Sequence, residues 1–163
     1  MEKFTGKVWL LGDDIDTDII MPTEYLVFKT IEEMKPYAFS PLRPELAAQI
    51  RSGDIIVAGS NFGCGSSREQ APEVVKALGL RCVIAKSFAR IFFRNAINNG
   101  LLLIENADLA DFVKEGEEIT VTVNEKIECR GKEFPIVSLP DNLVEIINAG
   151  GLVKAMRKRN GLD

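Results

Sequence analysis

Four short apolar runs, each bounded by glycine or by charged residues, recur along the chain at residues 7–11, 54–58, 81–85 and 101–104. Runs of this length are typical of strands that are buried on both faces of a sheet. Helical patterns lie between them, and each ends at a glycine suited to the left-handed position after a helix: 44–51 before Gly53, 68–78 before Gly79 and 87–99 before Gly100. The alternation predicts an α/β fold with helices covering a largely parallel sheet.

The pattern changes in the C-terminal third of the chain. After a short helix expected at 107–114, residues 118–123 alternate with period two. Ile127 and the run at 134–137 are expected to supply antiparallel partner strands. The predicted sheet is therefore mixed, with a parallel part followed by an antiparallel part.

Two further segments complete the prediction. We expect Asp141 to cap a helix that runs through Ile147, breaks at the glycines 150–151 and then resumes. The proline-punctuated segment 22–44 is expected to be a long loop. Because the chain contains no internal repeat and no low-complexity tract, we expect a single domain over residues 1–163.

Charge and composition exclude several classes of function. The 163 residues are 46% hydrophobic and carry a net charge of −4. The one basic cluster, at 154–159, is interpreted as a solvated helix end. Nucleic acids and anionic membranes are disfavoured as partners, since both require clustered positive charge. No apolar run approaches the roughly 20 residues of a membrane span, and we expect no signal peptide.

The chain has no histidine and three cysteines, Cys64, Cys82 and Cys129. The absence of histidine excludes Ser-His-Asp triads and zinc sites with imidazole ligands. The cysteines are spaced too far apart for this chain to hold an iron–sulfur cluster by itself, and their odd number favours a cytoplasmic location. One possible function is a thiol sensor at Cys64, where neighbouring N–H groups could lower the pKa of the thiol.

A glycine-rich segment, residues 58–72, joins a predicted strand to a predicted helix. Gly59, Gly63 and Gly65 allow positive φ and close approach of a ligand, and the start of the helix favours an anion. Ser66 with Glu69, or Ser67 with Gln70, could form a capping box. The segment lacks the Gly-Lys-Ser/Thr of a P-loop, so it is interpreted either as an anion site of another kind or as a tight structural turn.

Two serines followed by an arginine begin the predicted helix, and no histidine is available to activate a hydroxyl. Ser66 or Ser67 could act as a base or nucleophile only if its alkoxide were stabilised directly. Backbone N–H groups and Arg68 could supply that stabilisation. In the alternative interpretation, the serines only cap the helix.

Four carboxylates follow the first predicted strand within six residues: Asp13, Asp14, Asp16 and Asp18. A calcium loop of the EF-hand type is disfavoured, because it requires a glycine where Asp18 stands. The remaining alternatives are a solvated acidic turn, or a turn with one carboxylate directed toward the glycine-rich segment.

A third segment, residues 85–94, passes from a strand into an amphipathic helix with Ser87 as its expected cap. Its apolar stripe is expected to consist of Ile91 and Ile97 with some of Phe88, Phe92 and Phe93. Arg90 and Arg94 lie on one face and are expected either to form salt bridges or to face a partner.

Four motifs together resemble the aconitase superfamily, in the form of the separate small subunits of isopropylmalate dehydratases. They are Asp-Thr-Asp at 16–18, Gly-Ser-Ser-Arg-Glu at 65–69, Ala-Lys-Ser-Phe-Ala-Arg-Ile at 85–91 and Asn-Gly-Leu-Leu at 99–102. Their order and spacing match over residues 5–155. The resemblance implies a swivelling β/β/α domain of the aconitase C-terminal type and a large-subunit partner. That partner holds a [4Fe-4S] cluster through its own cysteines, and this chain holds no metal.

The same resemblance implies roles for individual residues. Ser66 falls on the catalytic base, Ser67 and Arg68 fall on residues that bind a substrate carboxylate, and Asp18 falls on an active-site aspartate. Gly65 belongs to the same substrate-binding turn. The implied hydro-lyase reaction converts 2-isopropylmalate into 3-isopropylmalate through 2-isopropylmaleate, a step of leucine biosynthesis.

Substrate choice within this family is associated with the segment after the Asp-Thr-Asp motif, here Tyr25, Leu26, Val27, Phe28 and Lys29. The apolar Val27 and Phe28 suit a branched alkyl group, whereas Lys29 could bind a carboxylate. A homoaconitase small subunit of lysine biosynthesis, or an enzyme with both substrates, is therefore the alternative within the family.

Two further expectations concern a non-enzymatic function and assembly. If the protein is not an enzyme, the alternative is an anion-binding regulatory module that keeps the Ser-Ser-Arg turn but catalyses no reaction. In isolation, the chain is expected to self-associate through the apolar surface that is meant for its partner.

Overall fold

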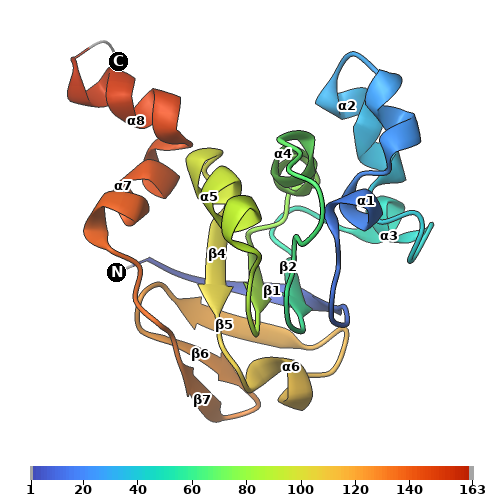
Figure 1. Cartoon of the computed structure of the whole chain (residues 1–163). Coiled ribbons are helices and arrows are strands. Elements are labelled where there is room, and N and C mark those ends of the chain that lie inside the picture. Colours follow the sequence, from blue (N-terminus) through green and yellow to red (C-terminus); the bar gives the residue numbers. More distant parts are fainter. Residues whose placement is uncertain (1, 162–163) are drawn as a thin grey trace.

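The computed structural model describes residues 2–161 and is built around one seven-stranded mixed sheet with the order β4-β3-β2-β1-β5-β6-β7 (Figure 1). The long strand β1 (Lys3–Leu10) joins two halves of the sheet. It pairs in parallel with β2 on one side and antiparallel with β5 on the other. The predicted mixed sheet is confirmed.

The parallel half contains β1, β2 (Ile55–Ala58), β3 (Cys82–Ala85) and β4 (Leu102–Glu105). Every residue of β2 and β3 is buried. Alternate side chains enter two different cores: Ile56 and Val83 face one, whereas Ile55 and Ile84 face the other. The prediction of strands buried on both faces is therefore confirmed.

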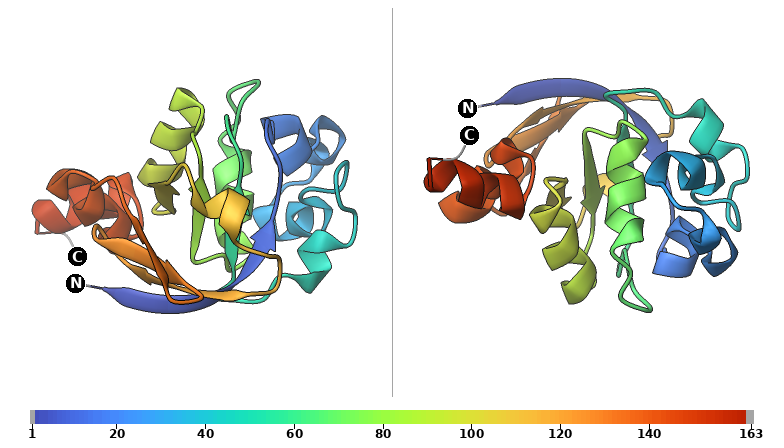
Figure 2. Two further views of the ribbon diagram at one scale, coloured as in Figure 1. Left: turned by 90° about the horizontal axis from the view of Figure 1, so that it is seen from below. Right: turned by 90° about the horizontal axis from the view of Figure 1, so that it is seen from above.

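The antiparallel half covers one face of the parallel half. It consists of β5 (Glu118–Thr122), β6 (Lys126–Cys129) and β7 (Lys132–Pro135). Ile119, Ile127 and Phe134 pack with Val8 and Ile84 in one core, and α6 (Leu109–Phe112) completes this side. The sheet must curl for this to happen, as Figure 2 shows from two directions.

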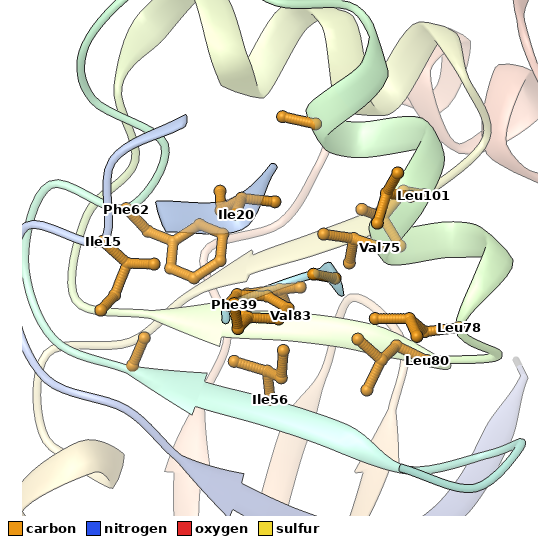
Figure 3. Close-up of a cluster of buried hydrophobic side chains, with 14 of the residues drawn as sticks. Ile15, Ile20, Phe39, Ile56, Phe62, Val75, Leu78, Leu80, Val83 and Leu101 are labelled. Atoms are coloured by element: carbon orange, nitrogen blue, oxygen red, sulfur yellow. The ribbon is translucent and has the colours of Figure 1, made fainter. Parts of the chain in front are cut away.

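Helices cover the other face of the parallel strands, where the first core lies (Figure 3). The longer ones are α4 (Gln70–Ala77), α5 (Arg90–Asn98), α7 (Asp141–Ala149) and α8 (Leu152–Arg159). The resulting order of helices, parallel strands and antiparallel strands is the expected β/β/α arrangement. Within residues 2–161, none of the helices combines the length and apolarity needed to cross a bilayer.

The segment 22–44 is not the predicted long loop. Together with its flanks it folds into short helical turns: α1 (Thr17–Ile20), η1 (Thr23–Val27), α2 (Ile31–Met34), η2 (Lys35–Tyr37) and α3 (Leu46–Gln49). Thr30 caps α2 by accepting a hydrogen bond from the Glu33 N–H (3.2 Å). The Phe39 N–H donates to the Ile20 carbonyl (3.1 Å), and both side chains are fully buried.

Two of the three predicted glycine helix ends are confirmed. Gly79 and Gly100 follow α4 and α5 with φ of +91° and +82°. The prediction for Gly53 is wrong, because α3 already ends at Gln49 and Gly53 instead turns the chain into β2. The Asp141 cap is also wrong: α7 begins at Asp141 itself, and no side chain caps it.

Candidate active site

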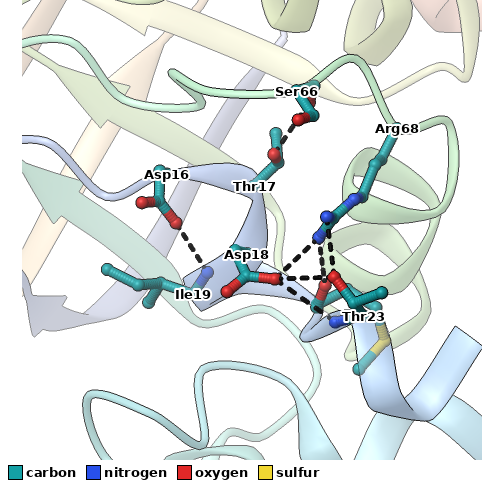
Figure 4. Close-up of polar contacts among 8 residues, drawn as sticks. Asp16, Thr17, Asp18, Ile19, Thr23, Ser66 and Arg68 are labelled. Atoms are coloured by element: carbon teal, nitrogen blue, oxygen red, sulfur yellow. Dashed lines mark hydrogen bonds and ion pairs between the residues drawn. The ribbon is translucent and has the colours of Figure 1, made fainter.

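Two loops leave the same edge of the sheet, because β1 and β2 are adjacent and parallel. We call residues 12–18 the acidic loop and residues 59–69 the glycine-rich loop. Their backbones are joined by the hydrogen bonds Asp14 N to Ser60 O (2.8 Å), Gly63 N to Ile15 O (2.7 Å) and Thr17 N to Cys64 O (2.8 Å). The buried Thr17 adds a bond from its hydroxyl to the Ser66 carbonyl (2.8 Å; Figure 4). The two motifs therefore form one unit.

Each carboxylate of the acidic loop has a different hydrogen-bond partner. Asp13 accepts from the Ser60 N–H (2.7 Å), Asp14 accepts from the Asn61 side chain (3.1 Å) and Asp16 caps α1. Among residues 2–161, no group of acidic or cysteine side chains converges as a metal site would require. Asp13, Asp14 and Asp18 all contact the glycine-rich loop, and Asp18 does so through the side chain of Arg68. The interpretation in which a carboxylate of this cluster is directed toward the glycine-rich segment is therefore confirmed.

Asp18 and Arg68 form an ion pair at the junction of the two loops. The Arg68 Nη1 donates to Asp18 Oδ1 (3.0 Å) and to the Met21 carbonyl (3.2 Å), and its Nη2 donates to the Thr23 hydroxyl (2.8 Å; Figure 4). The hydrogen bond from Arg68, followed by those from Thr23, lowers the pKa of the Asp18 carboxyl below its ordinary value. The arginine is held by three contacts, and the remaining two of the five guanidinium N–H groups can serve a ligand.

Glycines in the glycine-rich loop allow its backbone to pack closely against neighbouring side chains. Gly63 and Gly65 have φ of +85° and +96°. A Cβ on Gly63 would collide with the ring of Phe92, and one on Gly59 would collide with the carboxylate of Asp13. The predicted positive φ is confirmed at Gly63 and Gly65 but not at Gly59, and the predicted close approach of a ligand stays a prediction.

Ser66 and Ser67 do not cap a helix, and both predicted capping boxes are wrong. Helix α4 begins at Gln70, and no side chain caps it. Both serines are exposed, and within residues 2–161 their hydroxyls hydrogen-bond to no other residue. The two hydroxyls are therefore available to a ligand, whereas the Ser66 carbonyl is bound by the Thr17 hydroxyl.

A pocket of about 230 Å³ opens beside the two serines. Its polar wall is formed by Gly65, Ser66, Ser67, Arg68 and Thr17. Its opposite wall comes from the start of α5 and consists of Ala89, Arg90, Ile91, Phe92 and Asn95. The structure thus brings four of the predicted site residues together and adds a second wall that is partly apolar and partly cationic.

Ile91 was expected in the core, and this prediction is wrong. Ile91 is 55% exposed, while Phe92 and Ile97 are buried as expected. Helix α5 begins only at Arg90 and is not capped by Ser87, whose hydroxyl accepts from the Asn61 N–H (2.8 Å) instead. One signal was present: an arginine in the first turn of a helix opposes the helix dipole, which is more easily explained by binding than by stability.

The predicted substrate-selecting residues 25–29 do not line this pocket. Tyr25 stacks on Tyr37 with ring centroids 4.1 Å apart, and Phe28 lies 5.6 Å from the same ring. Val27 is 80% exposed, and Lys29 is exposed as well, whereas Leu26 packs against the first core. The segment begins two residues after Thr23, the partner of Arg68, so it is anchored to the site at one end.

The environment of Cys64 contradicts a thiol sensor. Burial, followed by the negative charges of Asp16 and Asp14, raises the pKa of the Cys64 thiol instead of lowering it. Burial also raises the pKa of Cys82 to about 12 and raises that of Cys129. All three cysteines are free thiols that disfavour the thiolate.

Slow alkylation is therefore expected of the native chain. With iodoacetamide at pH 8, no cysteine should react faster than a thiol in an unfolded peptide, and Cys64 should react before the buried pair. Mass spectrometry of the alkylated protein would measure the order, with protein in guanidinium chloride as the control. Rapid modification of Cys64 alone would restore the sensor hypothesis.

Comparison with known proteins supports the assignment of the fold and loops. A sequence profile described as "Aconitase C-terminal domain" matches residues 32–109. The 3-isopropylmalate dehydratase small subunit of Lachnospira eligens is 80% identical over 162 residues, covering 99% of both chains. The small subunit 1 of Archaeoglobus fulgidus is 49% identical, covering 94% of this chain and 99% of that one.

A solved structure agrees with these relatives. The crystal structure of 3-isopropylmalate dehydratase from Methanocaldococcus jannaschii matches with a TM-score of 0.92 at 40% identity, covering 98% of this chain and 96% of that chain. The curled sheet and the serine–arginine loop thus define a swivelling domain of the aconitase type. Within that class, the chain belongs to the family of 3-isopropylmalate dehydratase small subunits, which are parts of hydro-lyases.

Proposed function

We propose that this chain, together with an iron–sulfur large subunit, interconverts 2-isopropylmalate and 3-isopropylmalate in the cytoplasm. The observation that carries the proposal is the exposed Ser66 hydroxyl, which lies in a pocket beside an arginine that Asp18 holds in place. Family membership supports the substrate, and the site chemistry supports the roles of the residues.

The residues of this chain do not fit a [4Fe-4S] cluster. Cys82 and Cys129 are buried in the second core, and Cys64 lies on the glycine-rich loop. Three cysteine thiolates would have to converge on one point, and within the described residues no such group exists. The cluster is therefore assigned to the partner, and the steps below concern this chain alone.

Ser66 acts as the base that removes the proton α to a substrate carboxylate. A serine hydroxyl is a weak base, so its alkoxide must be stabilised by nearby donors. Within residues 2–161, the backbone N–H groups of Gly65, Ser66 and Ser67 donate to no other residue and are available for this task. The substrate hydroxyl on the neighbouring carbon leaves as the double bond forms, and the partner's cluster would supply the Lewis acid that takes up this hydroxide. On readdition of water, the Ser66 hydroxyl returns the proton to the carbon that lost the hydroxyl, so that H and OH exchange positions.

Arg68 and Ser67 bind a substrate carboxylate on the polar wall of the pocket. The guanidinium has two N–H groups left after its contacts with Asp18, Met21 and Thr23, and a pair of parallel donors suits a carboxylate. Asp18 positions this group and stays ionised over the working pH range, because its pKa lies below the ordinary value. Its negative charge is lost only as the pH falls through that lowered pKa.

Val27 is exposed and lies outside the Ser66 pocket of the isolated chain. We infer that it meets the substrate in the assembled enzyme, where its apolar side chain selects a branched alkyl group over a carboxylate. The homoaconitase or dual-substrate alternative predicts instead that Lys29 binds the extra carboxylate of a tricarboxylic substrate. The two alternatives differ in the ratio of rates with 2-isopropylmaleate and cis-homoaconitate.

Mixing the chain anaerobically with its cluster-loaded large subunit allows that ratio to be measured. We expect the wild type to favour 2-isopropylmaleate, and Val27→Arg to shift the ratio toward cis-homoaconitate by about 10- to 100-fold, the value of one charged hydrogen bond. Leu42→Arg, which introduces the same charge at another exposed apolar residue, is the control. A wild-type preference for cis-homoaconitate would favour the alternative.

A further inference from the structure

The outer face of α5 carries two arginines that have no partner in the described part of the chain. Arg90 and Arg94 are exposed, lie one turn apart and form no ion pair within residues 2–161. Several other arginines are paired with carboxylates: Arg43 with Glu115, Arg68 with Asp18 and Arg130 with Glu117. Arg90 and Arg94 differ from these arginines, although the chain carries a net charge of −4.

These two charges disfavour the isolated fold. Like charges at the i, i+4 spacing of a helix repel each other. Arg90 also stands in the first turn, where the helix dipole favours an anion. Nothing within the helix compensates for this arrangement, because α5 has no acidic residue in its first turn and no capping side chain.

Two apolar cavities flank the same helix face, and Arg90 and Phe93 line both. One, of about 290 Å³, is lined further by Phe88, Leu103, Val137 and Leu139. The other, of about 240 Å³, is lined further by Arg94, Ile97, Asn98 and Leu143. We call the two together the α5 groove. Val137 is 69% exposed, so part of this apolar surface faces solvent.

The α5 groove is continuous with the candidate active site. Arg90 also lines the Ser66 pocket, together with the exposed Ile91. A partner that brings a cluster to a substrate held at Ser66 has to cover the rim of that pocket. A partner that covers the rim on its α5 side also contacts the α5 groove.

We propose that the α5 groove is the docking surface for the large subunit, which places apolar side chains in the groove and carboxylates against Arg90 and Arg94. The proposal rests on the proposed function. Charge complementarity argues for an acidic edge on the partner, and continuity with the Ser66 pocket argues for the large subunit as the occupant. Glu105, which lines the cavity beside Arg90, repels carboxylates at one end and so directs the acidic edge toward Arg94.

Charge reversal at Arg94 tests this surface, because Arg94 does not line the Ser66 pocket. Sedimentation velocity under anaerobic conditions would measure the Kd between the full chain and its cluster-loaded large subunit. We expect Arg94→Glu to weaken binding by about 10- to 100-fold and to reduce the salt dependence of the Kd. Lys3→Glu, the same reversal on an exposed residue of β1, should leave the Kd within about twofold of the wild type.

The outcomes separate this proposal from the proposed function. If Arg94→Glu binds as tightly as wild type, the docking surface is overturned, even when turnover is normal. If wild type binds and Arg94→Glu does not, the surface is supported, even when neither substrate is hydrated. Circular dichroism of Arg94→Glu, expected to match wild type because the residue is exposed, excludes a folding defect.

Discussion

Replacing Ser66 by alanine is expected to lower kcat for the hydration of 2-isopropylmaleate by about 10²–10⁴-fold, the usual contribution of a positioned base. The hydroxyl makes no contact within the described chain, so its loss removes chemistry and little else. Stability and the Kd for the large subunit should therefore stay close to those of the wild type. Steady-state assays of the reconstituted complex, with thermal unfolding of the isolated chain, would measure both.

Ser67→Ala is the matched control for this experiment. Ser67 lines the same pocket on the same loop and is equally exposed, but it is assigned to carboxylate binding. Its replacement should mainly raise KM. If Ser66→Ala keeps the turnover of wild type and only weakens substrate binding, Ser66 is not the base, and the anion-binding module becomes the better account.

The second large effect is expected from Gly63→Ala, which should lower the stability of the fold and disorganise the glycine-rich loop. Gly63 has φ of +85°, and a Cβ there would collide with Phe92, a core side chain. The left-handed backbone costs about 1–2 kcal/mol and the overpacking about 1–3 kcal/mol. At about 2–4 °C per kcal/mol for a chain of this size, Tm should fall by about 4–20 °C.

Gly116→Ala separates the two contributions. Gly116 also has positive φ, +90°, but a Cβ there would meet nothing within 4 Å. Its replacement should cost only the backbone contribution of about 1–2 kcal/mol, so its Tm should fall by about 2–8 °C, less than that of Gly63→Ala. Scanning calorimetry would measure both variants. Equal changes in Tm would show that Phe92 gives way and that the contact does not fix the loop.

The fold was predictable where local signals and burial agree. Short apolar runs formed the buried strands because each sends side chains into two cores, as Ile55 and Ile56 do. Gly79 and Gly100 ended their helices because only positive φ continues the chain there. The short helices of segment 22–44 were missed because distant contacts help to hold them, such as the hydrogen bond from Phe39 to the Ile20 carbonyl.

The site was predictable in its residues but not in its geometry. Ser66 was expected to cap a helix on local grounds, yet Thr17, 49 residues earlier, binds its carbonyl and holds the loop away from α4. The pairing of Asp18 with Arg68 likewise spans 50 residues. Ile91 was assigned to the core together with Ile97, but six residues on a helix do not bring two side chains to one face, and the buried face of α5 is formed by Phe92, Ala96 and Ile97. Contacts between distant loops decided the first two cases, and the phase of the helix decided the third.

A titration of activity tests the central claim most directly. Hydration of 2-isopropylmaleate would be followed anaerobically with the chain alone, the cluster-loaded large subunit alone, and the large subunit at increasing concentrations of the chain. The account predicts no turnover by either protein alone and a rate that saturates at one chain per large subunit. Full turnover by the large subunit alone, or none at any ratio with an intact cluster, would contradict it.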